Sequence, residues 1–113
     1  MTSQSIEPLQ LFETTPGNWS LMLTDQHFGK VAAVFEQVDG FDGSGYDWAS
    51  VAHAVTERDA PHLQNRFRTD PEAGMFVAYG PDHEALAELG ALLAKAYSDL
   101  EYLGGLVAIA ELD

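Results

Sequence analysis

The sequence predicts an α+β fold: a small single domain with an antiparallel sheet built from hairpins and two main helices packed on it. In much of the first half of the chain, apolar residues alternate with other residues, which is typical of strands. Two longer segments space their apolar residues at helical intervals, and turns rich in glycine and proline separate the segments. At 113 residues the chain has the length of one domain, so we expect residues 1–113 to fold as a unit.

Two hairpins are predicted. Residues 9–13 and 19–23 alternate in character, and the turn-forming run Thr-Pro-Gly-Asn at 15–18 lies between them. Residues 66–69 and 75–79 are expected to pair in the same way around the turn at 70–74.

Residues 28–38 fit either a helix or a strand. Val31, Val34, Phe35 and Val38 recur at helical spacing, whereas the β-branched side chains favour a strand. Gly40, just beyond them, is of the type that caps the end of a helix. The helix is the favoured interpretation.

The first main helix has a recognisable start. Asp47 is a good N-cap residue and Trp48 opens a run of apolar residues at helical spacing. We therefore expect a helix that begins at Trp48 and ends before Pro61, followed by a short helix or turn over residues 61–65.

The second main helix follows Pro81, which suits a first helical position. Its predicted apolar stripe consists of Leu86, Leu89, Leu93 and Tyr97. Residues 99–113 fit either a helix interrupted at the Gly104-Gly105 pair or a turn that leads to a strand.

Charge is the most informative global property. Eighteen acidic residues stand against five basic ones, for a formal charge of −13, and the stretches 31–57 and 69–94 contain no lysine or arginine. Such a surface repels nucleic acid and anionic membranes and attracts a cationic partner. An acidic surface that only serves solubility is the alternative. The candidate binding residues are the acids in or beside loops of these stretches, with Tyr46 as an aromatic anchor: Asp39, Asp42, Glu72 and Asp82.

Compartment and membrane signals point to the cytoplasm. The chain has no cysteine, and residues 1–9 contain neither a basic residue nor an apolar run of signal-peptide length. No stretch is long enough to span a membrane. We therefore expect a cytoplasmic protein.

The sequence offers no catalytic, metal or cofactor motif. Glycines precede a helix start, as in phosphate-binding loops, but no P-loop lysine follows and Asp42 and Asp47 would repel a phosphate. We expect instead a tight loop with positive φ at Gly43 or Gly45. His53 and Glu57 lie one helical turn apart without a third ligand at a recognisable spacing. We expect neither an enzyme nor a cofactor.

The two aromatic residues beside Asp47 have different expected roles. Trp48 is expected in the core, beside Val51 at helical spacing, although tryptophan is also common in binding hot spots. Tyr46 is expected either as an exposed contact or packed on Val51 at the helix start.

The run G-S-G-Y-D-W at 43–48, followed by A-S-V-A, resembles the signature of the immunity protein 51 family of bacterial polymorphic toxin systems. Residues 70–76 resemble that family's second block and residues 110–113 its C-terminal end. The resemblance covers nearly the whole chain from about Trp19. It implies a small cytoplasmic α+β protein that binds a toxin made beside it, with no enzymatic activity and with Gly43, Gly45, Asp47 and Trp48 as motif residues.

Two functional hypotheses follow. The first is a toxin-neutralising immunity protein that blocks the active site of a cognate, cationic toxin domain by steric and electrostatic occlusion. The alternative is an acidic small-molecule-binding or regulatory domain with no toxin partner.

Overall fold

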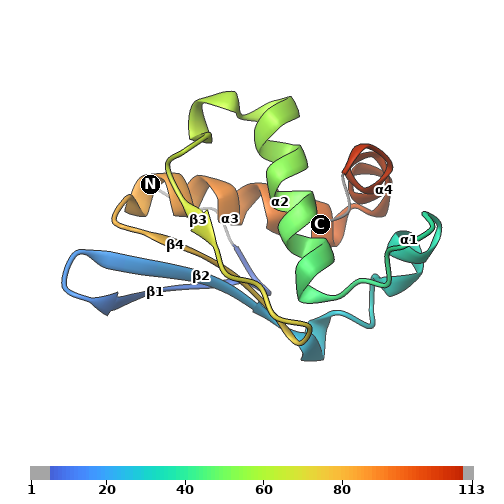
Figure 1. Cartoon of the computed structure of the whole chain (residues 1–113), viewed down its shortest axis with the longest axis horizontal. Helices are drawn as coiled ribbons and strands as arrows, with labels where there is room; N and C mark the ends of the chain where they lie inside the picture. Colours follow the sequence, from blue (N-terminus) through green and yellow to red (C-terminus); the bar gives the residue numbers. More distant parts are fainter. Residues whose placement is uncertain (1–5, 111–113) are drawn as a thin grey trace.

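A computed structural model describes residues 6–110, in which helices cover one face of a four-stranded antiparallel sheet (Figure 1). The strands lie in the order β1-β2-β4-β3, with bounds β1 Gln10–Thr15, β2 Asn18–Thr24, β3 Arg68–Thr69 and β4 Met75–Gly80. The helices are α1 Ala32–Glu36, α2 Gly45–Asp59, α3 His83–Ser98 and α4 Leu100–Ile109, with 3₁₀ turns η1 Asp25–His27 and η2 Pro61–Leu63. The predicted α+β class is confirmed.

Both predicted hairpins form, although β3 covers only residues 68–69 of the predicted strand 66–69. They join into one sheet because β2 pairs with β4. The central strands turn alternate side chains towards the helices, and these are fully buried: Leu21, Leu23, Phe76 and Ala78. Helix α2 packs against β4 and helix α3 against β2. Trp48 is 0% exposed in this core, as predicted.

The ambiguous segment 28–38 contains a short helix, α1, as favoured. Its buried residue Phe35 lies 5.3 Å from the Trp48 ring, measured between ring centres, which ties α1 to α2. The expected role of Gly40 is wrong, because α1 ends at Glu36 with Gln37 as its C-cap. Gly40 has a positive φ of 95°, but it lies in the loop between α1 and α2 and does not cap α1.

The second main helix is confirmed with a different start. Pro81 was expected at the first helical position, but α3 begins at His83 and Asp82 is its N-cap residue. The Oδ1 atom of Asp82 accepts a hydrogen bond from the Ala85 amide at 3.1 Å. The predicted stripe of Leu86, Leu89, Leu93 and Tyr97 is buried. None of the helices in residues 6–110 combines the length and apolarity needed to cross a membrane.

A third main helix, α4, runs through the glycine pair at 104–105. The tail is therefore a helix, as in the first of the two interpretations, but the glycine pair does not interrupt it. Asp99 caps it by accepting a hydrogen bond from the Tyr102 amide at 3.2 Å. Helix α4 packs against α1, α2 and α3. Residues 111–113, including most of the block that resembles the family's C-terminal end, lie outside the described residues.

The start of α2 touches the turn between β3 and β4 through backbone alone. The Gly45 amide donates a hydrogen bond to the Ala73 carbonyl at 3.1 Å. A Cβ atom at Gly45 would overlap the carbonyl oxygens of Glu72 and Met75, so only glycine fits there. The second glycine of the motif, Gly43, has a φ of 88°, which confirms the expectation that at least one of the pair has positive φ.

We expect Gly45→Ala to lower the free energy of unfolding by about 3 kcal/mol, because the added methyl group must push apart two backbone segments. Gly29→Ala is the matched control, since a methyl group added there would have no neighbouring atom within 4 Å. Urea unfolding of both variants measures the difference. Equal stability of the two variants would contradict the close contact.

Candidate functional site

The glycine-rich motif forms a loop and the first turn of α2. Helix α2 begins at Gly45, and its N-cap is Ser44, whose hydroxyl accepts a hydrogen bond from the Asp47 amide at 3.4 Å. The prediction that Asp47 caps a helix beginning at Trp48 is therefore wrong. Serine and aspartate are both good N-cap residues, and the one three residues upstream takes the position.

Asp47 instead holds the preceding loop in place. Its Oδ2 atom accepts hydrogen bonds from the Asp42 amide at 2.6 Å and the Gly43 amide at 2.8 Å, while the residue is only 7% exposed. Asp42 in turn accepts a hydrogen bond from the Ser44 amide through its Oδ1 atom. Burial raises the pKa of Asp47. The pKa of Asp42 is lowered, first by the interaction of its side chain with that of Asp47 and then by the hydrogen bond from the Ser44 amide. The loop is thus fixed by two carboxylates that bond to its own backbone.

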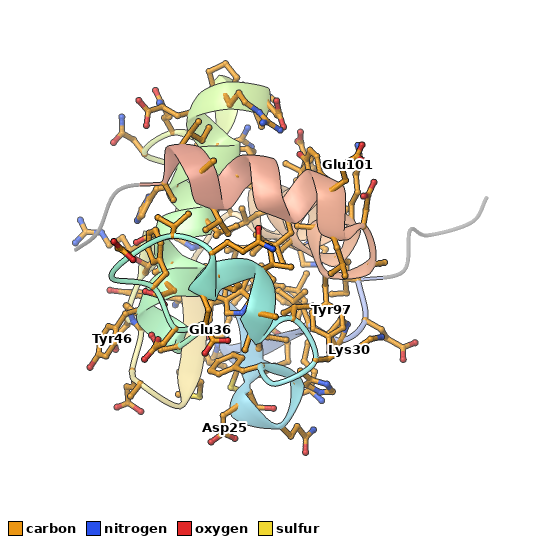
Figure 2. The ribbon with its side chains drawn as sticks, turned by 90° about the vertical axis from the view of Figure 1, so that its right-hand side faces the viewer. Asp25, Lys30, Glu36, Tyr46, Tyr97 and Glu101 are labelled. Carbon is orange, nitrogen blue, oxygen red and sulfur yellow. The ribbon has the colours of Figure 1, made fainter. Side chains whose placement is uncertain are left out.

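The first turn of α2, directly after this loop, presents Tyr46 to solvent with 48% of its surface exposed. On the neighbouring β3–β4 turn, Glu72 lies next to the backbone contact with Gly45. Asp25, at the end of β2, donates its amide to the Gly74 carbonyl of the same turn. Figure 2 shows Tyr46 and Asp25 at the same end of the molecule.

We call this surface the acidic end: five exposed acids on η1, α1, the α1–α2 loop and the β3–β4 turn, which are the segments that adjoin the first turn of α2. The acids are Asp25, Glu36, Asp39, Asp42 and Glu72. Within residues 6–110 none of the five makes a salt bridge. The structure therefore brings Asp42, Tyr46 and Glu72 together at the start of α2, and Asp39 lies in the same α1–α2 loop as Asp42.

The fifth predicted residue, Asp82, lies at the other end of β4. Its carboxylate caps α3 and also accepts a hydrogen bond from Arg66 Nε at 2.8 Å. The Arg66 guanidinium holds the pKa of Asp82 below its ordinary value. Asp82 thus has structural partners of its own and does not belong to the acidic end.

Two members of the acidic end were not singled out from the sequence. Asp25 lies outside both base-free stretches, and only the antiparallel pairing of β2 with β4 brings it beside the β3–β4 turn. Glu36 lies inside the first stretch but on a helix, whereas the prediction favoured acids in loops. The sequence signal that could have identified Glu36 was its position at the end of the predicted helix, next to a loop.

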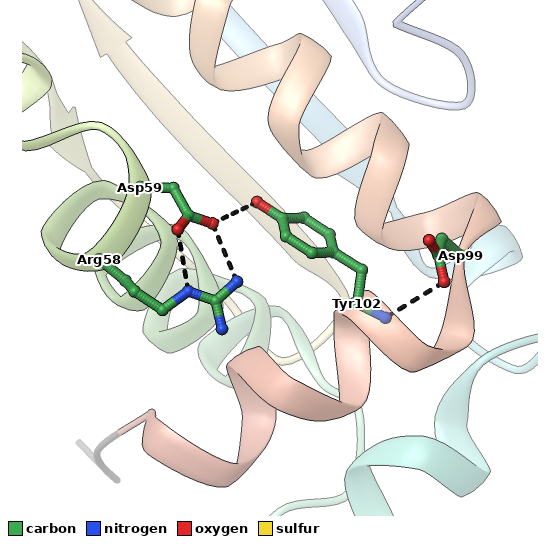
Figure 3. A network of polar contacts seen from close by, with 4 residues as sticks. All are labelled: Arg58, Asp59, Asp99 and Tyr102. Carbon is green, nitrogen blue, oxygen red and sulfur yellow. Dashed lines mark hydrogen bonds and ion pairs between the residues drawn. The ribbon is translucent and has the colours of Figure 1, made fainter.

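Arg58 and Lys95 lie in a cluster between α2 and α4, whereas Lys30 lies between η1 and α1, at the end of the molecule that Asp25 and Tyr46 share in Figure 2. Arg58 donates two hydrogen bonds to Asp59, at 3.0 and 2.9 Å, and Tyr102 donates one to Asp59 at 2.6 Å (Figure 3). The Lys95 ammonium lies 4.3 Å from the Tyr102 ring centre. These contacts lower the pKa of Asp59 to about 2, and burial with the Asp59 bond raises the pKa of Tyr102 to about 12. The cluster ties the end of α2 to α4.

The histidines have ordinary structural neighbours. His62 lies 2.7 Å from Glu88, the His83 ring packs against Trp19, and the His53 ring stacks on Phe67. Among the residues that the structure describes, no group of three histidine, aspartate or glutamate side chains is placed to hold a metal ion.

A shallow hollow of about 460 Å³ lies between α2 and the end of α4. Its lining includes His53, Glu57, Arg58 and Ile109, so charged and polar groups form much of its wall. Ligand pockets for small molecules are mostly apolar and enclose their ligand. The hollow therefore gives the small-molecule hypothesis little support.

Comparisons with known proteins give one match. A family model described as Immunity protein 51 matches residues 9–112. A search of curated proteins and a search of solved structures found no match.

We expect Asp47→Ala to lower the free energy of unfolding by about 2 kcal/mol or more, because two loop amides lose their acceptor. Asp47→Asn keeps an acceptor oxygen at the same place and should cost much less. Chemical denaturation of the two variants checks this. Equal losses would mean that the charge of Asp47, and not its bonding oxygen, holds the loop.

The Asp59 cluster predicts a pH dependence. The folded-state pKa of Asp59, about 2, lies below its ordinary value of 3.8, so its ionised form stabilises the fold above 3.8 and this stability is lost as the pH falls through about 2. Asp59→Asn should therefore be less stable than the original chain at pH 7, with a difference that shrinks between 3.8 and about 2. Urea titrations across that range measure it. A stability difference that stayed constant across that range would contradict the prediction.

Proposed function

Because the chain belongs to the immunity protein 51 family, we propose that it is a cytoplasmic inhibitor that binds a cognate toxin domain through the acidic end. The observation that carries this proposal is the group of five exposed acids of the acidic end that form no salt bridge within residues 6–110. We propose a cationic toxin surface as the partner, since opposite charge would complement these acids.

The proposed mechanism is occlusion. A toxin that acts on nucleic acid carries basic residues where it contacts phosphates. An acidic protein that covers this site removes substrate access and also gains a faster encounter from the attraction of opposite charges. The proposal needs no cofactor and no catalytic step in the inhibitor.

The first turn of α2, which carries Tyr46, and the loop before it are suited to such binding because hydrogen bonds already hold them in place. Asp47 bonds to two loop amides, and Gly45 fixes the helix start against the β3–β4 turn. A contact surface that is rigid before binding loses less conformational entropy when the complex forms. Tyrosine also supplies a large contact area with few rotatable bonds.

We expect the cognate toxin to be the C-terminal domain of a secreted protein encoded directly upstream. The test uses that domain, separated from co-expressed inhibitor in guanidinium and refolded. Binding rates are measured at low and high salt for the original chain and for the triple variant Asp39→Asn, Asp42→Asn, Glu72→Gln. We expect the triple variant to associate about tenfold more slowly at low salt and to lose most of the salt dependence.

A second triple variant is the control: Glu57→Gln, Glu84→Gln, Glu101→Gln. It removes the same charge from exposed sites outside the acidic end, and Glu101 lies far from Tyr46 in Figure 2. It should change the association rate much less. Equal effects of the two triple variants would contradict a localised interface, and absence of binding by the original chain would contradict the proposed function.

A further inference from the structure

The sheet has a second face that the helices do not cover. In antiparallel sheets with one face on a core, the other face is commonly polar. Here the register places five apolar side chains beside the polar residues Gln10, Ser20, Thr24 and Arg68. We call the apolar group the open sheet face: Phe12, Met22, Met75, Val77 and Tyr79. Phe12 is 41% exposed and Tyr79 39% exposed. Within residues 6–110, Figure 1 shows the helices on the opposite side of the sheet.

The register places these side chains next to one another. Ser20 pairs with Phe12 on one side and with Tyr79 on the other, so the two aromatic rings share a row across three strands. Met22 pairs with Val77 in the next row that faces the same way. The run Met75–Tyr79 is apolar at every position, which is typical of a strand buried on both faces.

The open sheet face continues into the acidic end. Met75 forms a bridge with Glu72, and the Thr24–Met75 pair lies directly before Asp25. The β3–β4 turn is therefore the corner where the apolar face and the acidic end meet.

We propose that the open sheet face is the apolar centre of the surface that binds the cationic toxin domain, with the acidic end as its charged rim. This inference rests on the proposed function and adds the part of the interface that holds the complex together. Protein interfaces combine an apolar, aromatic- and methionine-rich centre with a polar rim. Contacts at such a centre govern dissociation, whereas rim charges govern association.

Size supports a partner that covers both surfaces. Three strands about 4.8 Å apart and about 20 Å long, with the two-residue β3 beside them, give a face of roughly 300 Å². A stable interface buries about 800 Å² on each partner. The open sheet face alone is too small, and the adjoining acidic end supplies the remaining area.

Charge complementarity favours a cationic partner over a second copy of this chain. Each copy carries a charge of −13, and a symmetric contact that reached the corner would bring two acidic ends together. Four of the five basic residues already contact acidic or aromatic groups: Lys30, Arg58, Arg66 and Lys95. The fifth, Arg68, pairs with Tyr79 in the sheet. A basic toxin surface can contact the β3–β4 turn without the repulsion that two acidic ends would cause.

The experiment measures dissociation of the same upstream-encoded toxin domain from the variant Phe12→Ser, Tyr79→Ser. We expect the dissociation constant to rise about thirtyfold or more, as for loss of hot-spot aromatics, mainly through faster dissociation and equally at low and high salt. The matched control is Leu100→Ser, Ile109→Ser, which removes two apolar residues, each 52% exposed, from α4. The control should bind within about twofold of the original chain.

Folding and self-association are checked in parallel. Thermal melting establishes that both double variants fold, and the conservative variant Phe12→Leu, Tyr79→Phe should retain affinity because it keeps apolar area. Unchanged toxin binding by a folded Phe12→Ser, Tyr79→Ser variant would overturn the inference while leaving the proposed function intact. A dimer of the original chain in sedimentation that this variant abolishes without weakening toxin binding would also overturn it. Failure of the original chain to bind the toxin domain would instead refute the proposed function.

Discussion

The backbone contact between Gly45 and the β3–β4 turn is the constraint on which the rest of the acidic end depends. It sets the distance between α2 and the sheet, because carbonyl oxygens of Glu72 and Met75 occupy the space that any side chain at Gly45 would need. Asp47 then fixes the loop that precedes the helix by bonding to two of its amides. Tyr46 and Glu72 are held on one surface as a consequence, although neither belongs to the core. The same contact joins the glycine-rich motif to the segment 70–76.

Local sequence signals predicted the elements whose stability is local. Alternation and turn residues were sufficient for both hairpins, and the apolar stripe of α3 was sufficient for that helix. The start of α2 was misplaced because Ser44 and Asp47 have similar capping ability, and the choice between them depends on the loop amides that need Asp47 as an acceptor. The sequence alone could not decide whether the tail forms helix α4 or a strand, for a related reason. The glycine pair weakens a helix by itself, but here α4 lies close to other elements: Val34 is 3.8 Å from the place a Cβ would take at Gly104, and Arg58 is 3.5 Å from that at Gly105.

The binding surface was predictable only in part, because charge counts along a chain do not show where strands bring residues together. The two base-free stretches do converge at Asp42, Tyr46 and Glu72, and this convergence follows from the Gly45 contact. Asp25 joins them through strand pairing, and Asp82 departs because β4 carries the chain to the opposite end of the sheet. Apolar residues on the outer face of β4 were visible in the sequence as a continuous run. Their exposure became apparent only when the helices were seen to lie on one side of the sheet.

The acidic end and the open sheet face would make different contributions to one complex. Exposed carboxylates act over a distance of about 10 Å at moderate salt, so they raise the rate at which a cationic partner arrives, but they hold it weakly once it is bound. Apolar side chains act only in contact, and their burial slows departure. An inhibitor that must reach a toxin before the toxin reaches its substrate, and must then remain bound, needs both properties. A corner that joins the two surfaces supplies them together, and its backbone contacts at Gly45 and Gly74 keep their relative position fixed before the partner arrives.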